Sequence, residues 1–133
     1  MTNVTTELIR SHRSIRKFKN RSVSREIIEE LVLCGQAAAT SSNVQAVTVI
    51  HVTDEKKRES MAELAGGQPW VVSAGAFLVY CADMKRPKEA CEMQQGEFVA
   101  GMTEQFIIAT VDVALAAQNS VVAAESMGLG ICY

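Results

Sequence analysis

The chain has 133 residues, of which 48% are hydrophobic and 21% are charged, and its formal net charge is −2 with a pI near 5.7. This length and composition are typical of one globular domain and exclude an intrinsically disordered protein. The slightly acidic balance argues against wholesale binding to nucleic acid or to an anionic membrane.

The first ten residues, MTNVTTELIR, lack the apolar core of a secretory signal. The four cysteines form no CxxC pair, and only two histidines accompany them. This pattern argues against a zinc site or a disulfide framework and favours reduced thiols. We therefore expect a cytoplasmic protein without a bound metal.

Basic residues gather on and after a short predicted helix over residues 5–11. Between Glu7 and Ser24 lie six of the 13 Lys and Arg residues of the chain. One interpretation is a solvated helix end that the helix dipole favours. The other is an anion pocket, in which Arg13 and Arg16 flank the hydroxyl of Ser14 and suit a phosphate or the electron-rich edge of a bound ring.

Further along, the pattern predicts a helix and then a strand. Ser24 is placed to cap the helix at its N-terminus, and the helix is expected to bury Ile27, Leu31 and Val32. After a stretch of small and polar residues, residues 45–52 are rich in β-branched side chains and predict a strand.

The next three segments differ sharply in polarity. Residues 54–67 predict a charged helix that Gly66 closes. Residues 75–83 form a nearly continuous apolar run, as expected for a strand covered on both faces. Residues 84–97 are polar, and we expect them to form a mobile excursion.

Residues 97–127 predict one long, very apolar helix that is long enough to cross a membrane. Asp112, Asn119 and Ser126 recur at seven-residue intervals and predict a polar line on an otherwise buried helix. This line favours a core or interface helix over a membrane span. We expect the centre of the helix, near Ala116, to lie at an interface between subunits.

These elements predict an α/β (α+β) fold in which helices flank a central sheet. Residues 131–133, ICY, are expected to begin another strand. Because a chain that stops within a strand leaves a sheet edge exposed, we expect residues 1–133 to be a single but incomplete domain.

Five motifs, taken in order, resemble the FMN-dependent nitroreductase family. They are SHRSIRKF, AATSSNVQ, AGGQPWV, FLVYCAD and ALAAQNSVVAAESMGLGICY. The branch that the chain most resembles is that of the oxygen-insensitive NADPH nitroreductases and NADPH–flavin oxidoreductases. The resemblance covers residues 7–133, which correspond to the N-terminal half of the family fold.

The resemblance implies FMN as cofactor, NADPH or NADH as co-substrate and a homodimer with shared active sites. The implied reaction is a two-electron, ping-pong reduction of nitro compounds, quinones or free flavin, with hydride chemistry at the flavin and no catalytic side chain. The alternative is a non-catalytic flavin- or nucleotide-binding protein of the same fold.

The resemblance also implies which residues contact FMN. In the first motif Arg13 and Ser14 would face the ribityl and phosphate groups, and Arg16 would face the pyrimidine edge. The second motif would reach the flavin of the neighbouring subunit, whereas spacing alone fits an ordinary polar turn equally well. The implied contacts are His12, Arg13, Ser14, Arg16, Thr40, Ser41, Ser42, Asn43, Gln45, Gln68 and Tyr133.

Overall fold

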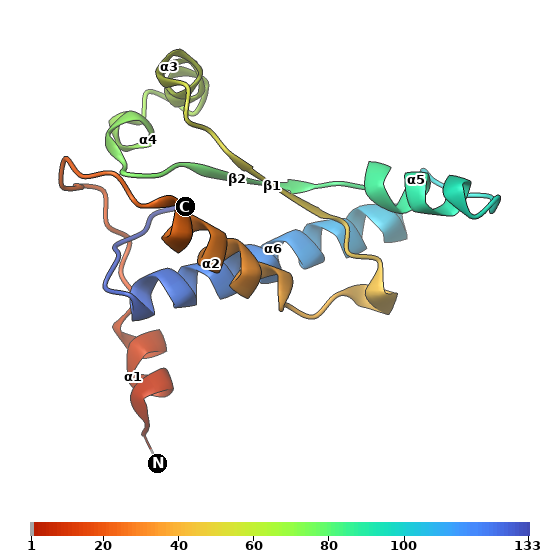
Figure 1. Ribbon diagram of the computed structural model, residues 1–133, viewed down its shortest axis with the longest axis horizontal. Coiled ribbons are helices and arrows are strands. Elements are labelled where there is room, and N and C mark those ends of the chain that lie inside the picture. The colour runs from red at the N-terminus through yellow and green to blue at the C-terminus, as the bar shows by residue number, and fades with distance from the viewer. Residues whose placement is uncertain (1) are drawn as a thin grey trace.

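The computed structural model describes residues 2–133, which fold around two packed helices and a small sheet (Figure 1). In chain order the elements are α1 (Val4–Ser11), α2 (Arg25–Gln36), the 3₁₀ turn η1 (Ser41–Asn43), β1 (Val47–His51), α3 (Glu55–Leu64), α4 (Pro69–Ser73), β2 (Leu78–Ala82), α5 (Lys85–Met93) and α6 (Thr103–Ser126). In Figure 1, α1 and α5 project away from the α2–α6 pair, and α3 and α4 lie beyond one end of the sheet.

Both predicted strands are confirmed with narrower bounds, and they pair with each other. β1 and β2 run antiparallel, with Val47 opposite Ala82 and His51 opposite Leu78. The prediction that the second strand is covered on both faces is wrong. α6 packs against the sheet, whereas Ile50 and Val79, which are opposite one another, line an open pocket beside α3.

The closest contact between helices joins α2 to α6. A Cβ atom at Gly35 would lie 2.7 Å from Ser120 Oγ and 3.1 Å from the Ala116 carbonyl oxygen, so only glycine allows this approach. Ser120 Oγ donates a hydrogen bond to the Leu31 carbonyl at 2.7 Å. Leu31 is buried as predicted, but the neighbouring core position is Ile28 rather than Ile27.

The predicted start of α2 at Ser24 and the predicted end of α3 at Gly66 are confirmed. The hydroxyl of Ser24 accepts a hydrogen bond from the Ile27 amide at 3.4 Å and caps α2. Gly66 has a φ of +85° just after α3, a conformation that an L-residue rarely adopts. The amide of Gly67 then reaches back to the Ala62 carbonyl at 2.9 Å, as expected for a helix closed by glycine.

The long helix is confirmed, but it begins at Thr103 rather than near residue 97. Seven residues fall only about 20° short of two full helical turns, so Asp112, Asn119 and Ser126 share one side of the helix. Asp112 is buried there, whereas Asn119 and Ser126 are exposed, and the prediction that the rest of the helix is buried is wrong.

α6 has one buried side and one exposed apolar side. By length and composition alone it could cross a membrane, but its packing against α2 and its buried Asp112 are those of a core helix. Ala116, expected at an interface, is only 5% exposed and faces α2. Exposed apolar side chains lie on the other side of the helix at Ile107, Val111 and Leu115, and Phe106 is exposed in its first turn.

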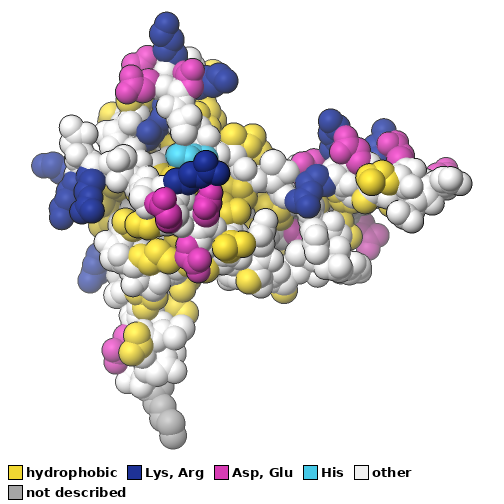
Figure 2. Space-filling model, in the orientation of Figure 1, with side chains coloured by type: hydrophobic (Ala, Val, Ile, Leu, Met, Phe, Trp, Pro, Cys, Tyr) yellow, Lys and Arg dark blue, Asp and Glu magenta, His cyan; other side chains and the backbone are white. Residues whose placement is uncertain are grey.

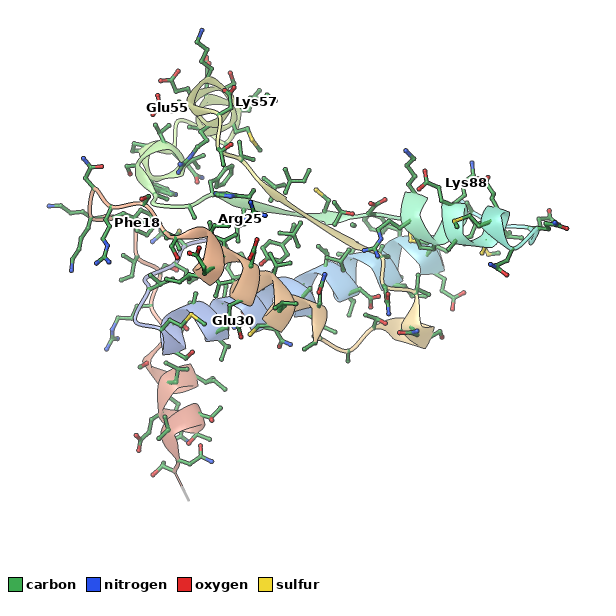
Figure 3. The ribbon with its side chains drawn as sticks, in the orientation of Figure 1. Phe18, Arg25, Glu30, Glu55, Lys57 and Lys88 are labelled. Carbon is green, nitrogen blue, oxygen red and sulfur yellow. The ribbon has the colours of Figure 1, made fainter. Side chains whose placement is uncertain are left out.

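The polar segment expected to be a mobile excursion instead forms α5. Two ion pairs of the i,i+4 kind run along it, Lys85 with Glu89 at 3.3 Å and Lys88 with Glu92 at 3.6 Å. This spacing of opposite charges supports a helix and was the signal in the sequence. Figure 3 shows Lys88 on this projecting helix, at the opposite end of the view from Phe18.

A carboxylate ties α5 to the sheet. Asp83 accepts hydrogen bonds from the Thr48 hydroxyl at 2.5 Å and from the Lys85 amide at 3.0 Å. Arg86 adds a hydrogen bond to the Val47 carbonyl at 3.0 Å. The hydrogen bond from Thr48 is the main reason why the pKa of Asp83 lies below its ordinary value of 3.8.

We predict that Thr48→Val raises the pKa of Asp83 towards 3.8. Because the folded-state pKa is depressed, the stabilisation is present above the ordinary value and is lost as the pH falls through the folded pKa. An NMR titration of the Asp83 carboxyl carbon measures the change. Thr53→Val, at an exposed threonine, is the control, and an unchanged Asp83 titration in Thr48→Val contradicts the prediction.

Candidate functional site

The first basic motif lies in a loop that is bound to the end of the chain. Ser14 and Ile131 form a parallel β-bridge, and the Ile15 amide donates to the Ile131 carbonyl at 2.7 Å. The expected strand at residues 131–133 therefore exists as a single bridge. Of the basic residues, only Arg10 lies in the last turn of α1, so the helix dipole does not account for Arg13 and Arg16.

Two more candidate residues bind this loop end to α6. His12 Nδ1 lies 2.7 Å from Glu125 Oε1, and the Tyr133 hydroxyl donates to Gln118 Oε1 at 3.2 Å. His12 thus holds the start of the motif against the C-terminal part of α6. Because the bridge between Ser14 and Ile131 is parallel, Tyr133 follows Ile131 in the same direction as Arg16 follows Ser14.

Arg16 lies over the ring of Trp70, which follows Gln68 by two residues in the chain. The guanidinium carbon of Arg16 lies 5.7 Å from the centroid of the Trp70 ring. Gln68 occupies the N-cap of α4, directly before Pro69, and its side chain makes no capping hydrogen bond. The structure therefore places Arg16 against the short helix at whose start Gln68 lies.

The charges of this loop are not neutralised within the described chain. Arg13 and Arg16 are exposed, and no carboxylate of residues 2–133 lies within ion-pair distance of either. Figure 2 shows dark-blue side chains gathered at the left edge of the molecule, over the loop that precedes α2. Guanidinium groups left without a carboxylate are suited to an anionic ligand.

The second motif, residues 40–45, forms a strained turn after α2. Thr40 is extended, and three non-glycine residues after it have left-handed backbones, with φ of 49° at Ser42, 57° at Asn43 and 54° at Gln45. Each such residue costs on the order of 1 kcal/mol and persists only where the surroundings hold it. Strain of this kind is concentrated at functional sites, which favours a site over an ordinary polar turn.

Asp112 is the residue that holds the turn, and the sequence did not assign it this role. Its carboxylate is 2% exposed, and Oδ1 accepts a hydrogen bond from the Ser41 amide at 3.1 Å. Within residues 2–133 its other oxygen, Oδ2, has no hydrogen-bond partner. The only signal in the sequence was an acidic residue in the middle of an apolar helix.

A cavity of about 360 Å³ adjoins the turn. Asn43 and Val44 form one wall, and the remaining lining residues come from α5, α6 and the segment between them. Most of the lining is apolar, and it includes Pro87, Cys91, Phe98 and Ile108. The second motif thus opens onto a space that α5 helps to enclose.

The two motifs lie far apart within one chain. His12 contacts α6 at Glu125, and the turn contacts the same helix at Asp112. At 1.5 Å per residue, these two points on the helix are about 20 Å apart. The turn and the loop also lie at opposite ends of α2 (Figure 1). His12, Arg13, Ser14 and Arg16 therefore lie in one loop, which contacts α4, the helix that begins after Gln68, and the chain end that leads to Tyr133. The residues of the turn lie apart from this loop.

The model of the nitroreductase family matches residues 9–133, and the chain belongs to this family. Among its relatives, the FMN reductase (NADPH) of Bacillus subtilis is 48% identical, over 98% of this chain and 53% of that protein. The chain thus spans about half the length of the curated relatives it matches.

Solved structures share the same fold. The structure of B. megaterium NfrA1 superimposes with a TM-score of 0.93 at 47% identity, covering 96% of this chain and 53% of that one. The NADPH:FMN oxidoreductase from Vibrio harveyi, in complex with NAD⁺, gives a TM-score of 0.89 at 42% identity, covering 96% and 54%. The predicted family and fold are therefore confirmed.

We predict that Asp112→Ala releases the turn at residues 40–45. A hydrogen bond to a charged acceptor contributes about 1.5–3 kcal/mol, so amide hydrogen exchange at Ser41 should become at least about tenfold faster. Asp112→Asn retains an acceptor oxygen and should restore most of the protection. NMR-detected exchange measures both variants, and an unchanged Ser41 rate in Asp112→Ala would show that the carboxylate does not hold the turn.

Proposed function

We propose that the complete protein is an FMN-dependent oxidoreductase that takes hydride from NADPH or NADH and reduces small acceptors such as nitro compounds, quinones or free flavin. The observation that carries the proposal is the loop of unneutralised cations, Arg13 and Arg16, which contacts the helix that begins after Gln68. Family membership and relatives named as NADPH-dependent flavin reductases support it.

The donors of the first motif fit FMN by their chemistry. Arg13 and Ser14 offer a guanidinium and a hydroxyl to the phosphate and ribityl groups. Arg16 offers a cation, and Gln68 offers an amide, to the pyrimidine edge of the ring system. Since no carboxylate of the described chain competes for the two arginines, their hydrogen-bond donors are available to the cofactor.

Bound FMN supplies the two-electron chemistry of this family, and the protein supplies placement and charge. Arg16 would stabilise the negative charge that gathers at the pyrimidine edge on reduction. His12 is engaged by Glu125 and would hold the motif in place rather than move a proton. The apolar cavity beside Asn43 would keep water away from an acceptor.

We further propose that the active site is shared between two subunits of a homodimer. One chain holds the two motifs about 20 Å apart along α6, so neither flavin would receive both motifs from the same chain. The exposed apolar side of α6, formed by Ile107, Val111 and Leu115, has the character of an obligate subunit interface. The four free thiols are consistent with the reducing cytoplasm, where we place the protein.

Enzymatic activity is tested by following the bound flavin under anaerobic conditions. NADPH should bleach the visible absorbance of the bound flavin in the purified complete protein, and a quinone or nitrofurazone should restore it. A flavin that stays oxidised under NADPH would instead identify a non-catalytic flavin-binding protein. A protein purified without flavin, and unable to bind added FMN, would contradict the proposal altogether.

We predict that Arg16→Ala in the complete protein weakens FMN binding at least about tenfold, since a charge-assisted hydrogen bond contributes about 1.5–3 kcal/mol. Fluorescence titration of the flavin-free protein with FMN measures the affinity. Lys57→Ala, which removes an exposed cation on α3, is the control. Equal affinities in wild type and Arg16→Ala would remove Arg16 from the site.

We predict that Leu115→Glu in the complete protein weakens both dimerisation and FMN binding, because an unpaired charge would be buried in the interface. Leu115 is 43% exposed in the single chain, so the substitution does not disturb the protomer core as a charge at Ala116 would. Sedimentation velocity followed at flavin absorbance measures both quantities, with Lys57→Glu as control. A monomer that retains full FMN would contradict the shared site.

A further inference from the structure

The side chain of Arg16 lies against the ring of Trp70. The loop from residue 12 to residue 24 contains neither helix nor strand apart from the bridge at Ser14. Arg16 is exposed and pairs with no carboxylate of the described chain. Its guanidinium lies over the Trp70 ring, 5.7 Å from the centroid. The attraction between a cation and the face of an indole therefore sets where this charge points.

Trp70 is itself held firmly, although α4 has only five residues and would not be stable alone. Arg58 of α3 donates two hydrogen bonds to the Val71 carbonyl, at 2.9 and 2.7 Å, and one to the Ala74 carbonyl at 2.6 Å. These bonds satisfy carbonyl groups at the end of α4 and fix it against α3. The indole is thus carried by an anchored helix rather than by a mobile loop.

The same short helix also positions Gln68, which is its N-cap residue. Arg16 and Gln68 come from segments that are distant in sequence, and no hydrogen bond joins their side chains. The contact between Arg16 and Trp70 ties the loop of the first motif to the helix that begins after Gln68. Removing the ring would leave both polar groups in the protein but release one from the other.

We infer that Trp70 is a positioning residue for the reaction: its ring holds the Arg16 guanidinium at the pyrimidine edge of the flavin and so helps to set the reduction potential of the cofactor. This inference rests on the proposed function. The reduced ring system carries the negative charge, so a misplaced cation weakens binding of reduced FMN more than binding of oxidised FMN. Loss of the indole therefore makes the potential more negative.

The test is a double-mutant cycle of Arg16→Ala and Trp70→Leu in the complete protein. Trp70→Leu should weaken binding of oxidised FMN about two- to fivefold, the scale of an exposed cation–π contact. If reduced FMN loses about threefold more, the two-electron midpoint potential falls by about 15 mV. In the Arg16→Ala background, Trp70→Leu should change neither quantity further.

Two variants guard against a general disturbance of α4. Trp70→Phe keeps an aromatic face and should retain most of the wild-type potential. Val72→Ala, an exposed position on the same helix, should leave the affinity and the potential unchanged. If Trp70→Leu shifts the potential equally with and without Arg16, the residue acts through the fold and the inference is overturned.

A measurement without flavin tests the contact directly. Protein labelled with 5-fluorotryptophan gives a ¹⁹F resonance for residue 70, identified by its loss in Trp70→Phe. In the flavin-free protein this resonance should shift in Arg16→Ala and stay in place in Val72→Ala. An unshifted resonance in Arg16→Ala would overturn the inference. If the wild type binds no FMN, the proposed function fails; if it binds FMN and the cycle is additive, only this inference fails.

Discussion

The close contact between α2 and α6 is the constraint on which the other features depend. It requires a glycine at position 35 and small residues opposite, and Ser120 secures it by a hydrogen bond to the α2 backbone. Because the two helices are packed together, the segments before and after α2, which carry the two candidate motifs, contact α6 at fixed positions. The basic loop reaches Glu125, and the strained turn reaches Asp112. The distance between the two half-sites is therefore a property of one helix pair.

Features encoded within a few residues could be predicted from the sequence. The cap at Ser24, the closure at Gly66 and the two strands depend on local backbone chemistry, and all were found at or near their expected places. The buried face of α2 was misjudged by one residue, because which of Ile27 and Ile28 faces the core depends on the direction from which α6 packs. α5 was missed although its ion pairs were visible in the sequence.

For the candidate site, the residues of the two motifs could be predicted, but their arrangement in space could not. The resemblance to the family assigned the residues, but it did not show that Arg16 lies on Trp70 or that Asp112 holds the Ser41 amide. Both contacts join segments that are distant in the chain, and no pattern of spacing specifies them. The unpartnered oxygen of Asp112 and the left-handed residues of the turn are also visible only in three dimensions. Such departures from local preference are where sequence reasoning is expected to fail at a functional site.

The bridge between Ser14 and Ile131 has a consequence for the order in which the molecule is assembled. It joins a residue near the beginning of the chain to one synthesised more than a hundred residues later. Contacts of such long range carry the largest loop-closure cost and form late in folding. During synthesis, the basic loop can therefore form this bridge only after α6 and the residues that follow it have emerged from the ribosome. The loop is therefore fixed only after the residues that follow α6 have been made, even though its cations are among the first residues synthesised.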